Sequence, residues 1–167
     1  EKDPVSLYLT TVGDWLPELR AENLPGCRSN SRLDCRHRQH FTEASEAATL
    51  QTLYDFCQEK HPGQVVTYLH SKGSYHRHKT NERWRKILSS AALHHDCISK
   101  TTDEQCNVCG LHFYMQWANF FPGNMFTARC DYVKQLLPPG EFTARQEQAV
   151  ADLLWLRYRG VLATQLF

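Results

Sequence analysis

The sequence predicts an α/β domain, and three observations support this prediction. A helical pattern of apolar residues over 42–60 stops at the break 61–63, and a strand pattern over 64–69 follows at once. Alternation of helix and strand is typical of a sheet flanked by helices. The chain has 167 residues, of which 41% are hydrophobic, which is enough to bury one core. Because no internal repeat and no Gly/Ser linker divides it, we expect residues 1–167 to form a single domain with a C-terminal helix.

The N-terminal part predicts a strand followed by weakly signalled structure. Residues 4–12 are rich in β-branched and aromatic side chains and end at a Gly-Asp turn, which favours a strand. A short helix over 14–22, weakened by Pro17, is expected next. The segment 26–40 is rich in Arg, Ser and Cys, and it indicates only a short strand near 33–36.

The middle of the chain predicts two helices around one strand. Thr42 is the expected N-cap of a helix that ends near Lys60. The strand over 64–69 is the clearest in the chain, and Thr80 is expected to cap a further helix. The apolar positions of that helix share one face, and they are Trp84, Ile87, Leu88 and Ala91.

The C-terminal part begins with an aromatic, irregular region over 106–128. Its rings either pack in a core or form a stacking platform for a base or a sugar. We expect a short helix over 128–137, stopped by the Pro-Pro-Gly sequence at 138–140. Thr143, with Gln146 three residues later, has the capping-box pattern that begins the last helix.

Positive charge is concentrated in the middle of a chain whose net charge is only +1. Residues 61–100 have seven Lys and Arg against two Asp and Glu, a net charge of +5, and six of the nine histidines. This block would attract an anionic ligand, although a solvated basic face without a ligand explains it equally well. No nucleic-acid partner is expected, because the overall charge is nearly neutral and no binding motif occurs. Such a partner would have used Arg77, Lys79, Arg83, Arg85 and Lys86. No membrane span is expected, since no apolar run approaches about 18 residues.

The seven cysteines leave three chemistries open. Their odd number allows up to three disulfides and one free thiol in an oxidising compartment. Cys97, Cys106 and Cys109, with a neighbouring histidine, have the spacing of a zinc site, and reduced buried thiols are the third possibility. The cysteine content favours the lumen of the secretory pathway (ER or Golgi) or the extracellular space. An organelle such as a plastid, reached by a targeting sequence removed before Glu1, is the alternative.

Two polar segments are candidate ligand sites. His70, Ser71, Lys72 and Gly73 follow the strand over 64–69, and in α/β sheets ligands bind outside the C-terminal ends of strands. The Lys72 ammonium suits a phosphate, and Gly73 allows close approach of the backbone. In the alternative interpretation these residues make only turn contacts, and Lys72 points to solvent.

The second polar segment contains Gly123, Asn124, Arg129 and Asp131. The Asn124 amide is suited to a hydroxylated ligand, and Arg129 or Asp131 is expected to face the same crevice. Alone, this signal is weak, because a Gly-Asn turn is usually local backbone chemistry and an Arg-x-Asp pair is usually a surface feature.

Together, the segments 66–74 and 123–133 resemble a group of glycosyltransferase-like proteins of algae and bacteria. In these proteins the motifs Y-x-H-[ST]-K-G and G-N-[FM]-[WF]-x-A-[RK] recur. In this chain the motifs read Tyr68-Leu69-His70-Ser71-Lys72-Gly73 and Gly123-Asn124-Met125-Phe126-Thr127-Ala128-Arg129. The resemblance covers about residues 45–137.

This resemblance implies a trimmed GT-A/Rossmann-like mixed sheet flanked by helices. It also implies a nucleotide-sugar donor and the transfer of its glycosyl group to a glycan or protein acceptor. The donor-binding residues would be Ser71, Lys72, Gly73, Gly123, Asn124 and Arg129. Asp131 is the best carboxylate near a motif and His70 the best imidazole, so these two are the catalytic candidates.

One departure from the family pattern concerns the metal. Metal-dependent GT-A enzymes hold the donor diphosphate through Mn²⁺ or Mg²⁺ on a D-x-D motif, and this chain has no D-x-D. The diphosphate charge would then be met by basic side chains, namely Lys72, Arg77, Lys79 or Arg129. Because the chain is also short for a complete transferase, the alternative is a noncatalytic scaffold or an accessory subunit of a larger protein assembly.

Overall fold

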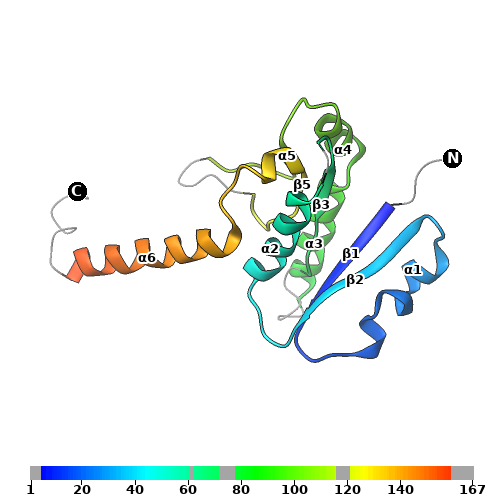
Figure 1. Ribbon diagram of the computed structural model, residues 1–167, viewed down its shortest axis with the longest axis horizontal. Helices are drawn as coiled ribbons and strands as arrows, with labels where there is room; N and C mark the ends of the chain where they lie inside the picture. The colour runs from blue at the N-terminus through cyan, green and yellow to red at the C-terminus, as the bar shows by residue number, and fades with distance from the viewer. Residues whose placement is uncertain (1–4, 61, 72–77, 116–120, 159–167) are drawn as a thin grey trace. The chain divides into compact units, whose positions relative to one another are not determined.

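Helices and two small sheets make up the computed structural model, which describes residues 5–60, 62–71, 78–115 and 121–158 (Figure 1). The predicted α/β class and the C-terminal helix are therefore confirmed. The chain divides into two compact units, Glu1–Leu50 and Gln51–Phe167. The single domain expected over 1–167 stays a prediction.

The first unit is built on two long parallel strands, β1 (Val5–Val12) and β2 (Leu33–Phe41). Parallel neighbours need a crossover connection, and here three short helical turns provide it. These turns are η1 (Pro17–Leu19), η2 (Ala21–Asn23) and α1 (Pro25–Ser29). The helix expected over 14–22 is thus two 3-10 turns, because Pro17 fits only the first turn of a helix. The disulfide Cys27–Cys35 joins α1 to β2.

The second unit contains a three-stranded antiparallel sheet in the order β3-β5-β4. Its strands are β3 (Val65–Tyr68), β4 (Val108–Gly110) and β5 (Phe126–Arg129). The predicted strand over 64–69 is confirmed as β3, whereas β4 and β5 lie in the region that was expected to be irregular. Because β3 and β5 run antiparallel, the end of β3 lies beside the start of β5, with Tyr68 opposite Phe126.

Five helices complete the described chain: α2 (Glu46–Gln58), α3 (Lys79–Ala92), α4 (His95–Thr102), α5 (Cys130–Val133) and α6 (Pro139–Tyr158). The expected caps Thr42, Thr80 and Thr143 are wrong. Thr143 lies inside α6, where its hydroxyl donates to the Pro139 carbonyl. The α2 helix begins only at Glu46, and His78 caps α3, its Nδ1 atom accepting the Thr80 N–H at 3.2 Å. Pro139, expected to stop a helix, begins α6, a position where proline loses no hydrogen bond.

The core of the second unit lies between the sheet and helices α2, α3 and α5. One buried cluster contains Cys57, Ala128, Cys130 and Val133, and the disulfide Cys57–Cys130 lies inside it. The fully buried Thr127 hydroxyl donates to the Ala92 carbonyl at 2.6 Å and lies 2.8 Å from the Thr67 hydroxyl. Since a hydroxyl both donates and accepts, this pair ties the end of α3 to the middle of the sheet.

The long α6 helix carries large apolar side chains that are exposed, namely Phe142, Val150, Leu153 and Leu154. Within the described residues, no helix combines the length and the apolar character that crossing a bilayer requires.

Candidate functional site

The first polar segment joins the second through one hydrogen bond. His70 follows β3, and its Nε2 atom lies 2.7 Å from the carbonyl oxygen of Gly123. A carbonyl can only accept, so Nε2 carries the proton in this contact. The His70 ring also stacks on Tyr68, with the ring centroids 5.8 Å apart and the planes 17° from parallel. Tyr68 is buried, so it gives the imidazole a fixed support.

The partner segment is a tight turn that only particular residues can make. Pro122 and Gly123 occupy the central positions, Gly123 has φ +84°, and the Asn124 N–H donates to the Phe121 carbonyl at 3.0 Å. These are the features of a type II turn. A Cβ atom on Gly123 would lie 2.4 Å from Leu88 Cδ1, so α3 also excludes any side chain there. Asn124 itself has φ +55°, a left-handed conformation that asparagine tolerates better than most residues.

The structure therefore brings four of the eight predicted site residues together. His70, the exposed Ser71, Gly123 and Asn124 lie at one end of the sheet, where β3 ends and β5 begins. Lys72 and Gly73, the next residues in the chain, lie outside the described residues. We name the gathered set, His70, Ser71, Gly123 and Asn124, the paired turns.

Arg129 and Asp131 lie at the opposite end of the sheet. Arg129 is opposite Val65, the first residue of β3, whose four residues span roughly 13 Å at ~3.3 Å per residue. The Asp131 carboxylate accepts the Gly63 N–H at 2.9 Å and lies 3.5 Å from the Arg129 guanidinium. Arg129 also donates to Glu104 at 2.7 Å. The two catalytic candidates, His70 and Asp131, are thus not brought together.

This separation follows from the strand pairing. The sequence argument placed the ligand outside the C-terminal ends of the strands of an α/β sheet, but β3, β5 and β4 form an antiparallel sheet. In an antiparallel pair the two C-terminal ends lie at opposite edges. His70 follows the end of β3 and Asp131 follows the end of β5, so the pairing separates them by the length of a strand.

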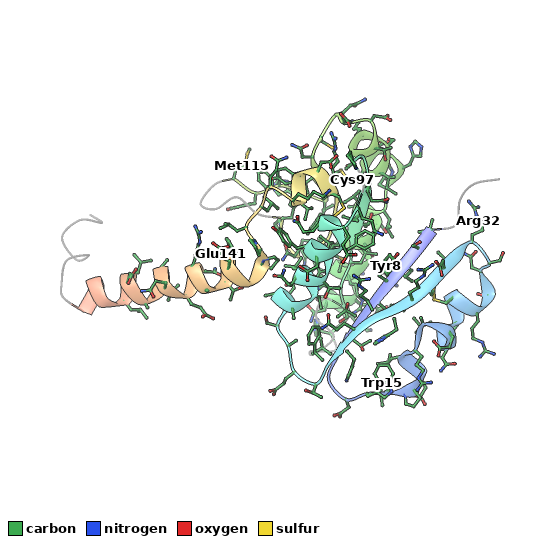
Figure 2. The ribbon with its side chains drawn as sticks, in the orientation of Figure 1. Tyr8, Trp15, Arg32, Cys97, Met115 and Glu141 are labelled. Carbon is green, nitrogen blue, oxygen red and sulfur yellow. A yellow bond between two sulfur atoms is a disulfide. The ribbon has the colours of Figure 1, made fainter. Side chains whose placement is uncertain are left out.

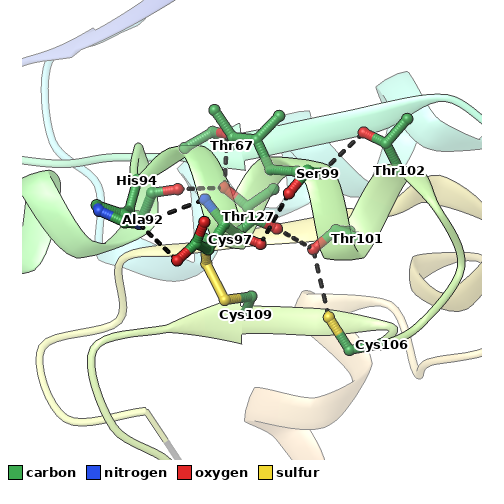
Figure 3. Close-up of a disulfide and its surroundings, with 12 residues drawn as sticks. Thr67, Ala92, His94, Cys97, Ser99, Thr101, Thr102, Cys106, Cys109 and Thr127 are labelled. Atoms are coloured by element: carbon green, nitrogen blue, oxygen red, sulfur yellow. Dashed lines mark hydrogen bonds and ion pairs between the residues drawn. A yellow bond between two sulfur atoms is a disulfide. The ribbon is translucent and has the colours of Figure 1, made fainter.

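The cysteine chemistry is resolved as three disulfides: Cys27–Cys35, Cys57–Cys130 and Cys97–Cys109. Because Cys97 and Cys109 are bonded to each other, they are not the thiolates that the zinc alternative needs. Cys106 is the free cysteine, and its sulfur lies 3.6 Å from the Thr101 hydroxyl (Figure 3). Three disulfides fit an oxidising extracellular or secretory environment.

The paired turns do not fit a carboxylate-held Mn²⁺ or Mg²⁺. Such ions prefer oxygen ligands, and the candidate carboxylate, Asp131, contacts Gly63 and Arg129 at the far end of the sheet. Over the described ranges, no group of three or more His, Cys, Asp or Glu side chains gathers in a way that could hold a metal ion.

Two residues that position the paired turns were not identified as such from the sequence. Tyr68 supports the His70 ring, and Leu88 packs against Gly123. Tyr68 is the first letter of the Y-x-H motif, and Leu88 is an apolar position of the helix that became α3. Both signals were in the sequence, but each looked like ordinary core packing.

The chain was compared with protein families, curated proteins and solved structures. No curated protein matches the chain, and no solved structure matches it either. A family model described as "Domain of unknown function (DUF8361)" matches residues 1–165. Since that match includes both compact units and both motifs, the chain belongs to this family.

Proposed function

We propose that this chain is a glycosyltransferase-like domain whose nucleotide-sugar donor binds at the paired turns. The observation that carries the proposal is the 2.7 Å hydrogen bond from His70 to Gly123, because it joins two motifs that are 53 residues apart in the sequence. Each motif alone is short. A contact between one residue of each motif supports the interpretation that they serve one site.

The chemistry of the paired turns suits a hydroxylated ligand. Ser71 is exposed and offers a hydroxyl group, while Asn124 is half-buried and offers both an amide donor and a carbonyl acceptor. A sugar presents hydroxyl groups that both donate and accept. Lys72 follows Ser71 in the chain and would supply the positive charge for the donor phosphates.

Within this proposal the acceptor is a glycan or a protein. The antiparallel pairing of β3, β5 and β4 differs from the mostly parallel sheet of a Rossmann-like core, so the proposal rests on the paired turns and not on the sheet topology. The compartment is the secretory lumen, which the three disulfides support. The His70 Nε2–H donates to the Gly123 carbonyl, so in this arrangement Nε2 is not available to a substrate. Arg129 is held by Glu104 and Asp131, which removes it from the donor contacts.

The second candidate is a noncatalytic scaffold or accessory subunit that retains this fold. The position of Asp131 favours it, because the carboxylate expected to act as base supports the loop at Gly63 instead. A scaffold of this kind would bind partner proteins and would turn over no sugar nucleotide.

The test is thermal unfolding with a panel of nucleoside diphosphates and sugar nucleotides, with and without Mn²⁺. A ligand that binds only the native state adds about 2.7 kcal/mol of stability at a hundredfold excess over Kd. We expect a selective, saturable increase in Tm that Lys72→Ala removes. The matched control is Lys100→Ala, which removes the same charge from an exposed position of α4 and should retain the increase. A folded protein whose Tm responds to no nucleotide would favour the scaffold.

A further inference from the structure

In the first unit, two histidine side chains of β2 converge on one hydroxyl group of β1. The Oγ1 atom of Thr11 lies 3.0 Å from His37 Nε2 and 2.9 Å from His40 Nδ1. A hydroxyl can donate one hydrogen bond and accept two, so it satisfies both imidazoles at once. The two ring nitrogens therefore face a common point in space.

An irregularity in the strand pairing makes this convergence possible. Side chains three residues apart on a regular strand point to opposite faces, so His37 and His40 would be separated by the sheet. The register passes from Leu9 opposite His37 to Thr10 opposite Gln39, which leaves Arg38 as an extra residue in β2. This bulge brings both histidines to the face of Thr11. Bulges are enriched next to functional sites, where they redirect side chains.

An aromatic side chain packs on both imidazoles. The ring of Trp15, which is labelled in Figure 2, lies edge-on to His37 and His40. The centroid distances are 5.0 and 4.9 Å, and the interplanar angles are 79° and 74°. Trp15 is 40% exposed and both histidines are half-buried. The two imidazole rings therefore pack against Trp15 and remain partly accessible to solvent and to dissolved ions.

We propose that His37 and His40, whose ring nitrogens converge on the Thr11 hydroxyl, form a binding site for a borderline-soft divalent transition metal ion such as Zn²⁺. His37 Nε2 and His40 Nδ1 are the protein ligands, and solvent completes the coordination. Neutral imidazole nitrogens bind Zn²⁺ at about 2.0–2.1 Å, whereas Mg²⁺ and Ca²⁺ require oxygen ligands. The ion replaces the Thr11 hydroxyl as the shared partner of the two nitrogens. This site is in a different unit from the paired turns and does not depend on the proposed glycosyl transfer.

The test follows the histidine ring protons by NMR during titration with Zn²⁺ alone. We expect the ring signals of His37 and His40 to shift together and to saturate at one equivalent, before the exposed His112 responds. His37→Gln should weaken the response of His40 at least about tenfold, because loss of even an outer-shell partner of a metal ligand costs about 10–100-fold in affinity and this variant removes a ligand itself. The matched control, His95→Gln, removes an exposed histidine of α4 and should leave both signals unchanged.

Two further variants keep the test decisive if His37→Gln perturbs the fold, which circular dichroism will show. His40→Gln reports the same loss at His37. Thr11→Val removes the competing hydroxyl and should retain Zn²⁺ binding, since the imidazoles are the ligands. The proposal is overturned if His37 and His40 respond no more strongly than His112, or if each responds independently of the other.

Discussion

The imidazole of His70 and the backbone of Gly123 meet at 2.7 Å, and this contact connects the end of β3 to the start of β5. It places an exposed serine and a left-handed asparagine at the same end of the sheet. The proposed donor site rests on this relationship, so its energetic value is the first quantity to measure.

Replacing His70 with alanine should lower the free energy of unfolding by about 1–2 kcal/mol. The loss combines one hydrogen bond, worth about 0.5–1.5 kcal/mol, with the stacking on Tyr68. Urea denaturation measures it. The control is His95→Ala, whose side chain is 88% exposed and which should change stability by less than about 0.5 kcal/mol. Equal effects of the two variants would mean that the His70 contact contributes nothing.

Gly123→Ala should destabilise the second unit more than Gly63→Ala does. Both glycines have φ +84°, so both alanines carry backbone strain of about 1–3 kcal/mol. Only at Gly123 would the added Cβ clash with a neighbouring side chain, because it would lie 2.4 Å from Leu88 Cδ1. Overpacking of this kind adds at least about 1 kcal/mol to the cost of the substitution. Chemical denaturation of both variants gives the difference.

A second measurement identifies the source of that difference. In a Leu88→Ala background the Gly123 substitution should cost less, because the two residues are in direct contact and their effects are coupled. If the losses of stability caused by Gly123→Ala and Leu88→Ala simply add, a clash with Leu88 is not the source of the difference.

The disulfide Cys57–Cys130 should stabilise the fold more than Cys97–Cys109. The two bonds close loops of very different length, with sequence separations of 73 and 12. In the chain-entropy model they contribute about 4 and about 3 kcal/mol, respectively. Paired Cys→Ala variants of each, compared by urea denaturation, test the order, and the reverse order would contradict the assignment of Cys57–Cys130 to the core.

Alkylation of the folded, unreduced protein should modify one cysteine. All six other cysteines are in disulfides, so iodoacetamide should react at Cys106 alone. Peptide mass spectrometry identifies the site, and Cys106→Ser should abolish the label while three disulfides remain. Labelling at Cys97 or Cys109 would show that the pairing is different.

The sequence predicts those elements whose signal is local. Strand β1 and strand β3 appear where β-branched residues cluster, and the Pro-Gly sequence after Lys60 separates α2 from β3 as expected. β2 is longer than its short prediction. Its exposed positions hold Arg and Gln and its half-buried positions include two histidines, so the segment resembles a polar loop in the sequence. β4 and β5 have three and four residues, too few for an alternating pattern to be visible.

The candidate site, too, could be predicted only where its signal is local in the sequence. The polar residues of the paired turns could be identified from their motifs, but the distance between His70 and Asp131 depends on the pairing of β3 with β5 across about sixty residues. No local pattern fixes whether such a pair is parallel or antiparallel. The convergence of His37 and His40 was also invisible, because a regular strand would point them apart and only the bulge at Arg38 reverses this.

The central claim is that the paired turns bind a sugar nucleotide, and an NMR titration tests it most directly. The backbone amides of Ser71, Gly123 and Asn124 are followed while the sugar nucleotides of the thermal panel are added, with Gly63 and Arg129 as reporters at the opposite end of the sheet. The account predicts saturable shifts at the three turn amides with one common Kd, and little change at Gly63 and Arg129. Asn124→Gly, which keeps the left-handed backbone but removes the amide side chain, should weaken binding. Saturable shifts confined to Gly63 and Arg129, or no shifts with any sugar nucleotide, would contradict the account.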